Sequence, residues 1–124
     1  MTRKHMGEPE LDISVVLPVF NEAGNLQRFI PELSTVLREM ERTYEIIAVD
    51  DGSTDDSVAV LRELKVGEPH LRIIRFRRNF GQTAGFAAGF DLARGVVVIT
   101  MDADGQNDPA DIPAMLQVME DGAY

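Results

Sequence analysis

The stretch Val96–Asp108, VVVITMDADGQND, joins a predicted buried strand to a pair of carboxylates. It begins with the β-branched run Val96–Ile99, which is typical of a strand covered on both faces. The strand leads into Asp102 and Asp104, which are separated by one residue. Two neighbouring carboxylates repel each other unless a cation or hydrogen-bond donors stabilise them. The pattern therefore indicates either a site for a divalent cation with phosphate, or a polar turn that happens to be acidic.

The composition limits the possible classes of protein. The chain has 124 residues, is 44% hydrophobic and carries a formal net charge of −9, so it is one small domain or part of a larger one. The acidic balance argues against a nucleic-acid binder, and the absence of cysteine excludes disulfides and thiolate metal sites. The apolar runs are too short for a transmembrane helix of about 20 residues. Residues 1–12 are predicted to be a disordered lead-in, since MTRKHMGEPE lacks the apolar core of a signal peptide.

A strand followed by a helix is predicted four times along the chain. The predicted strands are the apolar runs Ile13–Leu17, Tyr44–Val49 and Leu71–Phe76, and then the strand that begins at Val96. The predicted helices are the amphipathic stretch from Leu26 to Met40, a helix capped by Ser53 or Thr54 that runs to about Lys65, the small-sided stretch Gly81–Arg94, and a helix that starts at Asp108 and Pro109. Pro31 is predicted to kink or delay the first helix.

This alternation predicts an α/β fold, a Rossmann-like parallel sheet with helices on both faces. In such sheets, ligands bind beyond the carboxyl ends of the strands. Three loops are expected at that edge, namely Pro18–Glu22, Asp50–Thr54 and Asp102–Gln106. The sequence therefore predicts an acidic sheet edge, formed by Glu22, Asp50, Asp51, Asp102 and Asp104.

Common motifs of other α/β enzymes are missing. The sequence contains no GxGxxG, no GxxxxGK[ST] and no GxSxG, so dinucleotide binding, P-loop phosphate binding and a nucleophile elbow have no support. A bacterial receiver domain also gathers acids around Mg²⁺. Its acid pair would follow the first strand, however, and here that strand is closed by Pro18. A receiver domain is therefore only a minor alternative.

Four segments carry a resemblance to a known family. They are ISVVLPVFNEAGNL, EIIAVDDGSTDDS, RNFGQTAGFAAGF and MDADGQNDPADIP, in this order. Together they resemble the family 2 glycosyltransferases, which have the GT-A fold, and in particular the branch that makes polyprenyl-phosphate sugars. The resemblance covers nearly all of Ile13–Tyr124 and implies that residues 13–124 are the nucleotide-sugar-binding, N-terminal half of a GT-A domain. It also implies that the acceptor-binding half and any catalytic base follow residue 124, so that this chain alone binds nucleotide and metal weakly and transfers no sugar.

The resemblance implies two sets of site residues. The nucleotide-sugar-binding set is Pro18, Phe20, Glu22, Val49, Asp51, Asp102, Ala103 and Asp104, and the metal-binding set is Asp102, Asp104 and Gln106. In the family's pattern the first three line the base and ribose pocket, and Val49 and Asp51 contact the base. The implied cofactor is Mg²⁺ or Mn²⁺, which would stabilise the charge that builds on a nucleoside diphosphate leaving group. Gln106 is the weakest of the implied ligands, since an amide oxygen binds Mg²⁺ less firmly than a carboxylate.

Several of these residues also have structural interpretations that the sequence leaves open. Asp50 could brace the turn that follows it, Phe20 could pack in the core, and Glu22 could cap the first helix. Other acids stand in the first turns of predicted helices, where they complement the helix dipole, and are assigned no chemistry: Asp55, Asp56, Asp108 and Asp111. Three arginines could meet a phosphate or an anionic acceptor headgroup, or could form a solvated strand end: Arg75, Arg77 and Arg78.

The resulting hypothesis is a metal-dependent, inverting glycosyltransferase that moves a sugar from a nucleotide-diphosphate sugar to a polyprenyl phosphate, such as dolichyl or undecaprenyl phosphate. We expect a cytoplasmic location, with the full-length protein at the cytoplasmic face of a membrane, and no nucleic-acid partner. Exposed apolar surface could also lead to a homo-oligomer. Two alternatives stay open: a family 2 glycosyltransferase with a polysaccharide or other glycan acceptor, and a non-catalytic module that binds nucleotide or metal.

Overall fold

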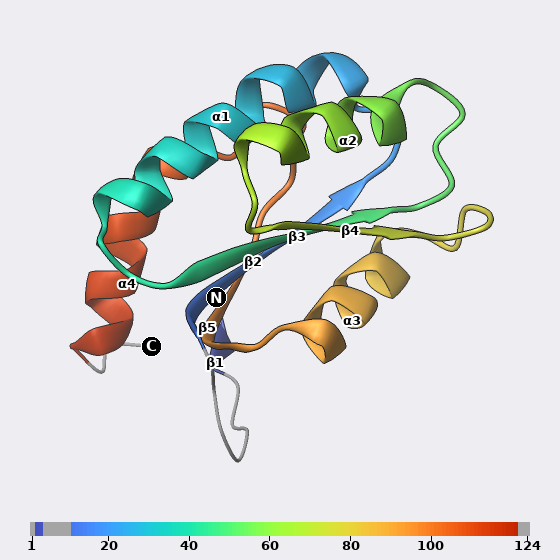
Figure 1. Cartoon of the computed structure of the whole chain (residues 1–124). Helices are drawn as coiled ribbons and strands as arrows, with labels where there is room; N and C mark the ends of the chain where they lie inside the picture. The colour runs from blue at the N-terminus through green and yellow to red at the C-terminus, as the bar shows by residue number, and fades with distance from the viewer. Residues whose placement is uncertain (1, 4–10, 122–124) are drawn as a thin grey trace.

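The computed structural model describes residues 2–3 and 11–121, which form one sheet with helices on both of its faces (Figure 1). The strands are β1 (Thr2–Arg3), β2 (Leu11–Val19), β3 (Tyr44–Asp50), β4 (Leu71–Arg75) and β5 (Gly95–Thr100). The helices are α1 (Ala23–Glu39), α2 (Ser57–Gly67), α3 (Gln82–Leu92) and α4 (Ile112–Glu120), the last preceded by the short 3₁₀ helix η1 (Pro109–Asp111). In this part of the chain, no helix has the length and apolar character needed to cross a membrane.

The sheet has the strand order β1-β5-β2-β3-β4. The four longer strands β5, β2, β3 and β4 are parallel to their neighbours, and β1 pairs with β5 in the antiparallel direction. In the register, Val19 lies opposite Asp50, and Val16 lies opposite Thr100. The carboxyl ends of β2, β3 and β5 therefore meet at one edge of the sheet. The predicted α/β fold, a Rossmann-like parallel sheet with helices on both faces, is confirmed.

Two apolar cores cover the faces of the sheet. Every residue of β3 is buried, and successive side chains point to opposite faces, as expected for a central strand. Ile46 and Ala48 belong to the larger core with residues of α1, α2 and α4, while Ile47 and Val49 belong to the smaller core, against which Phe86 of α3 packs. Figure 1 shows the corresponding layers, with α1 and α2 on one side of the sheet and α3 on the other.

The glycines of α3 allow this helix to lie close to β2. A Cβ atom at Gly89 would lie 2.2 Å from Cγ1 of Val16, and one at Gly85 would lie 3.3 Å from Cβ of Pro18. Both glycines are buried. The small residues of α3 therefore allow its close packing on β2, and Gly85 brings α3 near the strand end that borders the candidate site.

A buried carboxylate links the strands near their amino ends. Glu45 of β3 is only 1% exposed. It accepts hydrogen bonds from the Ser14 hydroxyl at 2.6 Å, the Arg94 amide at 2.7 Å and the Arg72 guanidinium at 2.8 Å. Burial alone would raise the pKa of Glu45, but these hydrogen bonds and the positive charge of Arg72 outweigh burial and hold the pKa below its ordinary value of 4.5.

Some predicted boundaries differ from the structure. The helix α1 begins at Ala23 and continues through Pro31, so the predicted delay is wrong. The helix α2 begins at Ser57, so the prediction that Ser53 or Thr54 caps it is also wrong. The reason is that these two residues hydrogen-bond to the loop after β2 instead. The predicted start of the last helical segment is confirmed, because the Asp108 side chain accepts a hydrogen bond from the Ala110 amide at 2.9 Å.

The predicted lead-in differs from the structure at four positions. Thr2 and Arg3 pair with β5, and Leu11 and Asp12 belong to β2. Residue 1 and residues 4–10 lie outside the described residues, as do residues 122–124.

We predict that Gly89→Ala destabilises the fold by about 2 kcal/mol, because the new methyl group would overlap the fully buried Val16 side chain. The gain in helix propensity of about 1 kcal/mol offsets only part of this cost. Urea denaturation measures the change. Gly24→Ala in α1 is the matched control, since no neighbouring atom would lie within 4 Å of the added methyl group. Equal stability of the two variants would contradict the close packing of α3.

We also predict that Glu45→Gln lowers the free energy of unfolding at pH 7 by about 2 kcal/mol, through loss of the charge-assisted hydrogen bonds. Because the pKa of Glu45 is lowered by folding, its contribution is complete above pH 4.5 and is lost as the pH falls through the folded-state pKa. The difference between Glu45→Gln and wild type should therefore shrink below pH 4.5 in denaturation curves. Glu63→Gln, at an exposed position of α2, should match wild type throughout.

Candidate functional site

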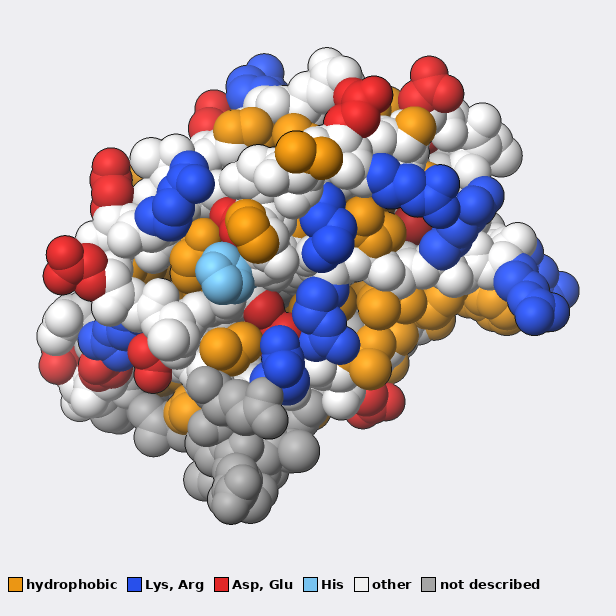
Figure 2. All heavy atoms as spheres, viewed as in Figure 1, with side chains coloured by type: hydrophobic (Ala, Val, Ile, Leu, Met, Phe, Trp, Pro, Cys, Tyr) orange, Lys and Arg blue, Asp and Glu red, His pale blue; other side chains and the backbone are white. Residues whose placement is uncertain are grey.

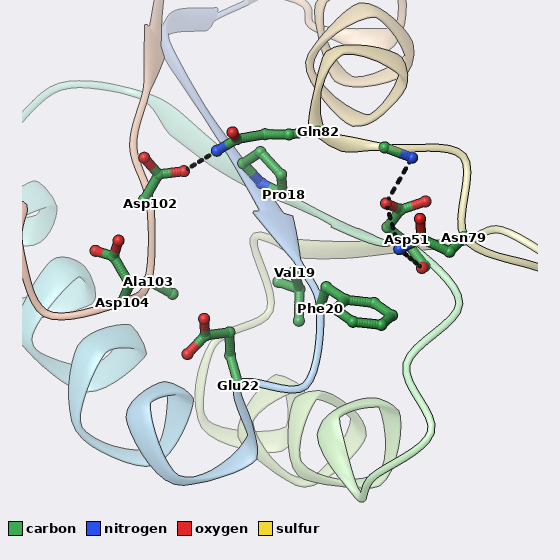
Figure 3. A pocket seen from close by; sticks show the side chains of 11 residues that line it. Pro18, Val19, Phe20, Glu22, Asp51, Asn79, Gln82, Asp102, Ala103 and Asp104 are labelled. Atoms are coloured by element: carbon green, nitrogen blue, oxygen red, sulfur yellow. Dashed lines mark hydrogen bonds between the residues drawn. The ribbon is translucent and has the colours of Figure 1, made fainter.

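A pocket of about 380 Å³ opens at the edge where the carboxyl ends of the parallel strands meet (Figure 3). A volume of roughly 300–1,000 Å³ is usual for small-molecule sites. The lining residues come from four segments that are distant in the sequence: Pro18, Val19, Phe20, Glu22, Asp51, Asn79, Gly81, Gln82, Asp102, Ala103 and Asp104. The position agrees with the rule that ligands of parallel α/β sheets bind beyond the strand ends.

The order of the strands determines which side of the pocket each segment occupies. The end of β2 lies in the middle, because β2 pairs with β5 on one side and with β3 on the other. Figure 3 shows Asp102 and Asp104, which follow β5, on one side of Pro18 and Phe20, with Asp51 on the other side. The pocket therefore places an aromatic ring between two acidic regions.

The loops after β2 and β3 are joined by the side chain of Asn21. Its Oδ1 atom accepts hydrogen bonds from the Thr54 amide at 2.8 Å and the Asp55 amide at 3.2 Å. The backbone amide of Asn21 donates to Oγ of Ser53 at 2.9 Å. Asn21 has a φ of 52°, in the left-handed region, which asparagine tolerates better than most residues. These bonds fix the loop on which its neighbours Phe20 and Glu22 stand.

The carboxylate of Asp51 fixes the loop that precedes α3. It accepts hydrogen bonds from the Phe80 amide at 2.6 Å, the Gly81 amide at 2.9 Å and the Asn79 side-chain amide at 3.1 Å. Next to it, Gly52 has a φ of 73°, and a Cβ there would lie 2.5 Å from the carbonyl carbon of Arg78. The close approach of the two loops therefore needs both the acceptor at position 51 and glycine at position 52.

The two carboxylates after β5 each use one oxygen for a hydrogen bond. Oδ1 of Asp102 accepts from the side-chain amide of Gln82, and Oδ1 of Asp104 accepts from the Gln106 amide at 3.0 Å. Within the part of the chain that the structure describes, the Oδ2 atoms of both residues have no hydrogen-bond donor, and neither residue forms an ion pair. These two oxygens are available to a ligand or a cation.

Most of the predicted nucleotide-sugar-binding residues line the pocket, namely Pro18, Phe20, Glu22, Asp51, Asp102, Ala103 and Asp104. Val49 does not, because its side chain is fully buried in the core beneath α3 with Val16 and Ile47. Gln106 of the predicted metal set is exposed and lies outside the pocket lining, although its backbone contacts Asp104.

The structure also shows which of the structural roles considered for Phe20, Glu22 and Asp50 these residues have. Phe20 is 44% exposed, so it is not a core residue. Glu22 stands at the cap position of α1, but its side chain caps no backbone amide and instead accepts a hydrogen bond from the Asn25 side chain at 2.7 Å. Asp50 is fully buried, and its Oδ2 atom accepts from the Ser53 amide at 3.1 Å, so Asp50 braces the turn. Its Oδ1 atom has no hydrogen-bond partner among the described residues.

Four lining residues were not predicted from the sequence: Val19, Asn79, Gly81 and Gln82. The last three lie in the loop after β4 and at the start of α3. Since β4 is parallel to β3, the loop after it must reach the same edge of the sheet as the other three loops. The parallel direction of the strand before this loop would therefore have been enough to predict that Asn79–Gln82 lies near the site.

The pocket can hold a divalent cation only together with ligand oxygens. Among residues 11–121, no three His, Cys, Asp or Glu side chains form a group that could bind a metal unaided. The two carboxylates of Asp102 and Asp104 do line the pocket. Mg²⁺ is commonly held by one or two carboxylates together with substrate phosphates, so this pair fits a cation that arrives with a phosphorylated ligand.

The chain is similar to known enzymes in sequence and in structure. The chain is 43% identical over 112 residues to the dodecaprenyl-phosphate galacturonate synthase of Rhizobium johnstonii, an overlap of 89% of this chain and 33% of that protein. It is 40% identical over 111 residues to the undecaprenyl-phosphate 4-deoxy-4-formamido-L-arabinose transferase of Proteus mirabilis, again 89% of this chain and 34% of that protein. The chain thus spans about a third of the length of these relatives.

Solved structures show the same fold at low sequence identity. The mannosyltransferase PcManGT of Pyrobaculum calidifontis, determined with GDP-Man and Mn²⁺, matches with a TM-score of 0.70 and 21% identity over 92% of this chain and 34% of that one. Glucosyl-3-phosphoglycerate synthase of Mycobacterium tuberculosis, determined with Mn²⁺, UDP and glucosyl-3-phosphoglycerate, matches with a TM-score of 0.69 and 22% identity over 89% of this chain and 40% of that one. These likenesses identify the GT-A fold.

The family assignment rests on the sequence itself. The model of the family described as glycosyl transferase family 2 matches residues 14–124, which is nearly the whole chain. This protein chain therefore belongs to glycosyl transferase family 2.

Proposed function

We propose that residues 13–124 form the nucleotide-sugar-binding part of a metal-dependent, inverting glycosyltransferase that transfers a sugar to a polyprenyl phosphate. The observation that carries the proposal is the pocket itself, which combines the exposed Phe20 ring with Asp51 on one side and the Asp102–Asp104 pair on the other. A nucleotide-diphosphate sugar has the matching parts, a flat base and a charged diphosphate.

Phe20 and Asp51 form the proposed base side of the pocket. An exposed aromatic ring offers a face on which a nucleobase can stack. A carboxylate has about four lone-pair sites, and three loop donors already bind to Asp51. One site is then left to accept a hydrogen bond from a ring N–H of the base. Pro18 and Glu22 line the pocket at the end of β2, and we assign both to the base and ribose.

Asp102 and Asp104 form the proposed diphosphate side, with Mg²⁺ or Mn²⁺ as the cation and Ala103 in contact with the nucleotide. Their free Oδ2 atoms would hold the cation together with phosphate oxygens. Gln106 stays the third proposed ligand, since its backbone already contacts Asp104 and its exposed side chain can reorient. When bound, the cation would stabilise the negative charge that grows on the diphosphate as the sugar departs.

The proposed acceptor comes from the relatives, which are named for undecaprenyl and dodecaprenyl phosphate and are 40–43% identical to this chain. A phosphate acceptor is already anionic, so it needs less help from a general base than a hydroxyl does. We place the acceptor-binding groups in the part of the relatives that this chain does not span, and the whole enzyme at the cytoplasmic face of a membrane.

A prediction from the proposed function concerns metal-dependent nucleotide binding. We expect calorimetry with UDP and GDP to show binding of one nucleotide that strengthens when Mn²⁺ is added, and we expect Asp104→Ala to lose at least tenfold in affinity in the presence of Mn²⁺. The reason is the removal of one of the two carboxylates that face the diphosphate. Glu63→Ala changes the net charge equally at an exposed position of α2 and should bind as wild type does.

Binding and transfer measurements together separate the alternatives. Nucleotide binding that does not change on addition of Mn²⁺ or on Asp104→Ala would contradict the proposed metal site. A non-catalytic module would bind nucleotide or metal, but the full-length protein would transfer no sugar. A family 2 enzyme with a glycan acceptor would bind nucleotide and metal in the same way. Transfer assays on the full-length protein, with undecaprenyl phosphate or an oligosaccharide as acceptor, then separate that enzyme from the proposed one.

A further prediction concerns Asp51. Asp51→Ala removes the acceptor for three donors, so we expect hydrogen exchange at the Phe80 and Gly81 amides to accelerate at least tenfold. We expect nucleotide affinity to fall as well, since the proposed base contact is lost. Asp56→Ala is the control from the same loop, because the Asp56 carboxylate is exposed and does not cap α2. Unchanged exchange at Phe80 would show that Asp51 does not hold this loop.

A further inference from the structure

The segment Leu71–Phe90 differs in composition from the rest of the chain. It contains four arginines and four of the six phenylalanines of the chain, and neither Asp nor Glu, although the whole chain has 21 acids and a net charge of −9. The segment comprises β4, the loop that follows, and most of α3. Positive charge and aromatic rings are therefore concentrated on the edge strand and the loop beside it.

The charged and aromatic side chains of this loop face solvent. Arg75, Arg77 and Arg78 are exposed, and Phe80 is 53% exposed. In Figure 2 the Lys and Arg side chains form a band along β4 that continues to the tip of the loop, and hydrophobic side chains lie directly below this band. The surface thus joins a basic stripe to an apolar one.

These arginines are not used in ion pairs. Within the described ranges 2–3 and 11–121, Arg75, Arg77 and Arg78 have no carboxylate partner within 4 Å, whereas Arg72 pairs with Glu45. Arg78 instead lies over the ring of Phe80, 4.7 Å from its centroid, and Phe80 contacts the edge of Phe76 at 5.6 Å. In a chain with a large excess of acid, three guanidinium groups without an ion-pair partner, at the end of β4 and in the loop that follows, indicate an anionic partner.

The loop is also the rim of the candidate site. Asn79 and Gly81 line the pocket, and Asp51 holds the amides of Phe80 and Gly81. A partner bound to the exposed side of this loop would therefore lie beside the pocket opening. This position matters if the acceptor is carried by a lipid, because such an acceptor reaches the pocket from a membrane surface.

We propose that Arg75, Arg77, Arg78 and Phe80 form a docking surface for an anionic lipid bilayer, with the arginines on the headgroup phosphates and Phe80 at the boundary between headgroups and acyl chains. Basic residues beside exposed aromatic ones are the combination that binds to membrane interfaces. A bilayer fits better than a soluble polyanion, because a flat surface meets only this face and avoids the acids elsewhere. The proposal rests on the proposed function for the use of a lipid-borne acceptor.

Co-sedimentation with vesicles tests the charge component. The chain should bind vesicles of phosphatidylcholine with phosphatidylglycerol, bind much less to phosphatidylcholine alone, and dissociate as salt is added. Each arginine close to an anionic membrane surface strengthens binding to that membrane about fivefold. The triple variant Arg75→Gln, Arg77→Gln, Arg78→Gln should therefore lose about 100-fold. The control triple Arg38→Gln, Arg42→Gln, Arg62→Gln removes the same charge from exposed positions of α1, α2 and the turn after α1, and should lose less than fivefold.

A fluorescent reporter tests the aromatic component. The chain contains no tryptophan, so Phe80→Trp provides a single probe. Its emission should shift to shorter wavelength on anionic vesicles and be quenched by brominated acyl chains. Val66→Trp, at an 86% exposed position of α2, should show neither effect.

The outcomes keep this proposal separate from the proposed function. Loss of vesicle binding in the Arg75, Arg77, Arg78 variant, with UDP and GDP binding unchanged in calorimetry, supports the docking surface. Failure of wild type to bind anionic vesicles, equal losses in the two triple variants, or an unshifted Phe80→Trp emission would overturn the docking surface whether or not nucleotide binds. Failure of nucleotide binding with intact vesicle binding would instead count against the proposed function alone.

Discussion

The hydrogen bonds accepted by the Asp51 carboxylate connect the parts of the site. The Asp51 amide donates to the Val19 carbonyl at 2.8 Å, which fixes the carboxylate next to the end of β2. The carboxylate in turn binds the amides of Phe80 and Gly81, immediately before α3. The first residue of α3 is Gln82, whose side chain reaches Asp102 after β5. One buried acceptor thus begins a chain of contacts that crosses the whole pocket.

The carboxylates at the two ends of the sheet differ in whether a cationic side chain of the fold neutralises them. At the amino end, Glu45 is balanced within the fold by the guanidinium of Arg72, and its pKa is lowered despite burial. At the carboxyl end, Asp102 and Asp104 have hydrogen-bond donors but, among the described residues, no cationic side chain in contact. The repulsion between these acids is therefore left for a bound cation to relieve, which is the physical basis of the proposed metal site.

Local patterns in the sequence were enough to predict the fold. Buried β-branched runs, amphipathic spacing and the Asp108–Pro109 helix start each depend on neighbours in the chain, and the structure agrees with them. The wrong helix cap results from a contact between distant segments, because Ser53 accepts a hydrogen bond from the backbone amide of Asn21, 32 residues away, and does not cap a helix end. Val49 has the parity of the strand face beneath α3, so its side chain packs in the core and does not line the pocket.

Asp51 holds the loop before α3 and is also the proposed acceptor for the base, and these two roles limit how the pocket can vary. A carboxylate that already accepts three hydrogen bonds has its orientation fixed before a ligand arrives, so a base that donates to its remaining lone pair meets a preorganised acceptor. A substitution that removed the hydrogen bonds between the Asp51 carboxylate and Asn79–Gly81 would also loosen this loop. The loop forms the rim of the pocket and carries Arg78 and Phe80. Under the proposed function, recognition of the base, the shape of the rim and the position of the exposed basic surface therefore all depend on the Asp51 side chain.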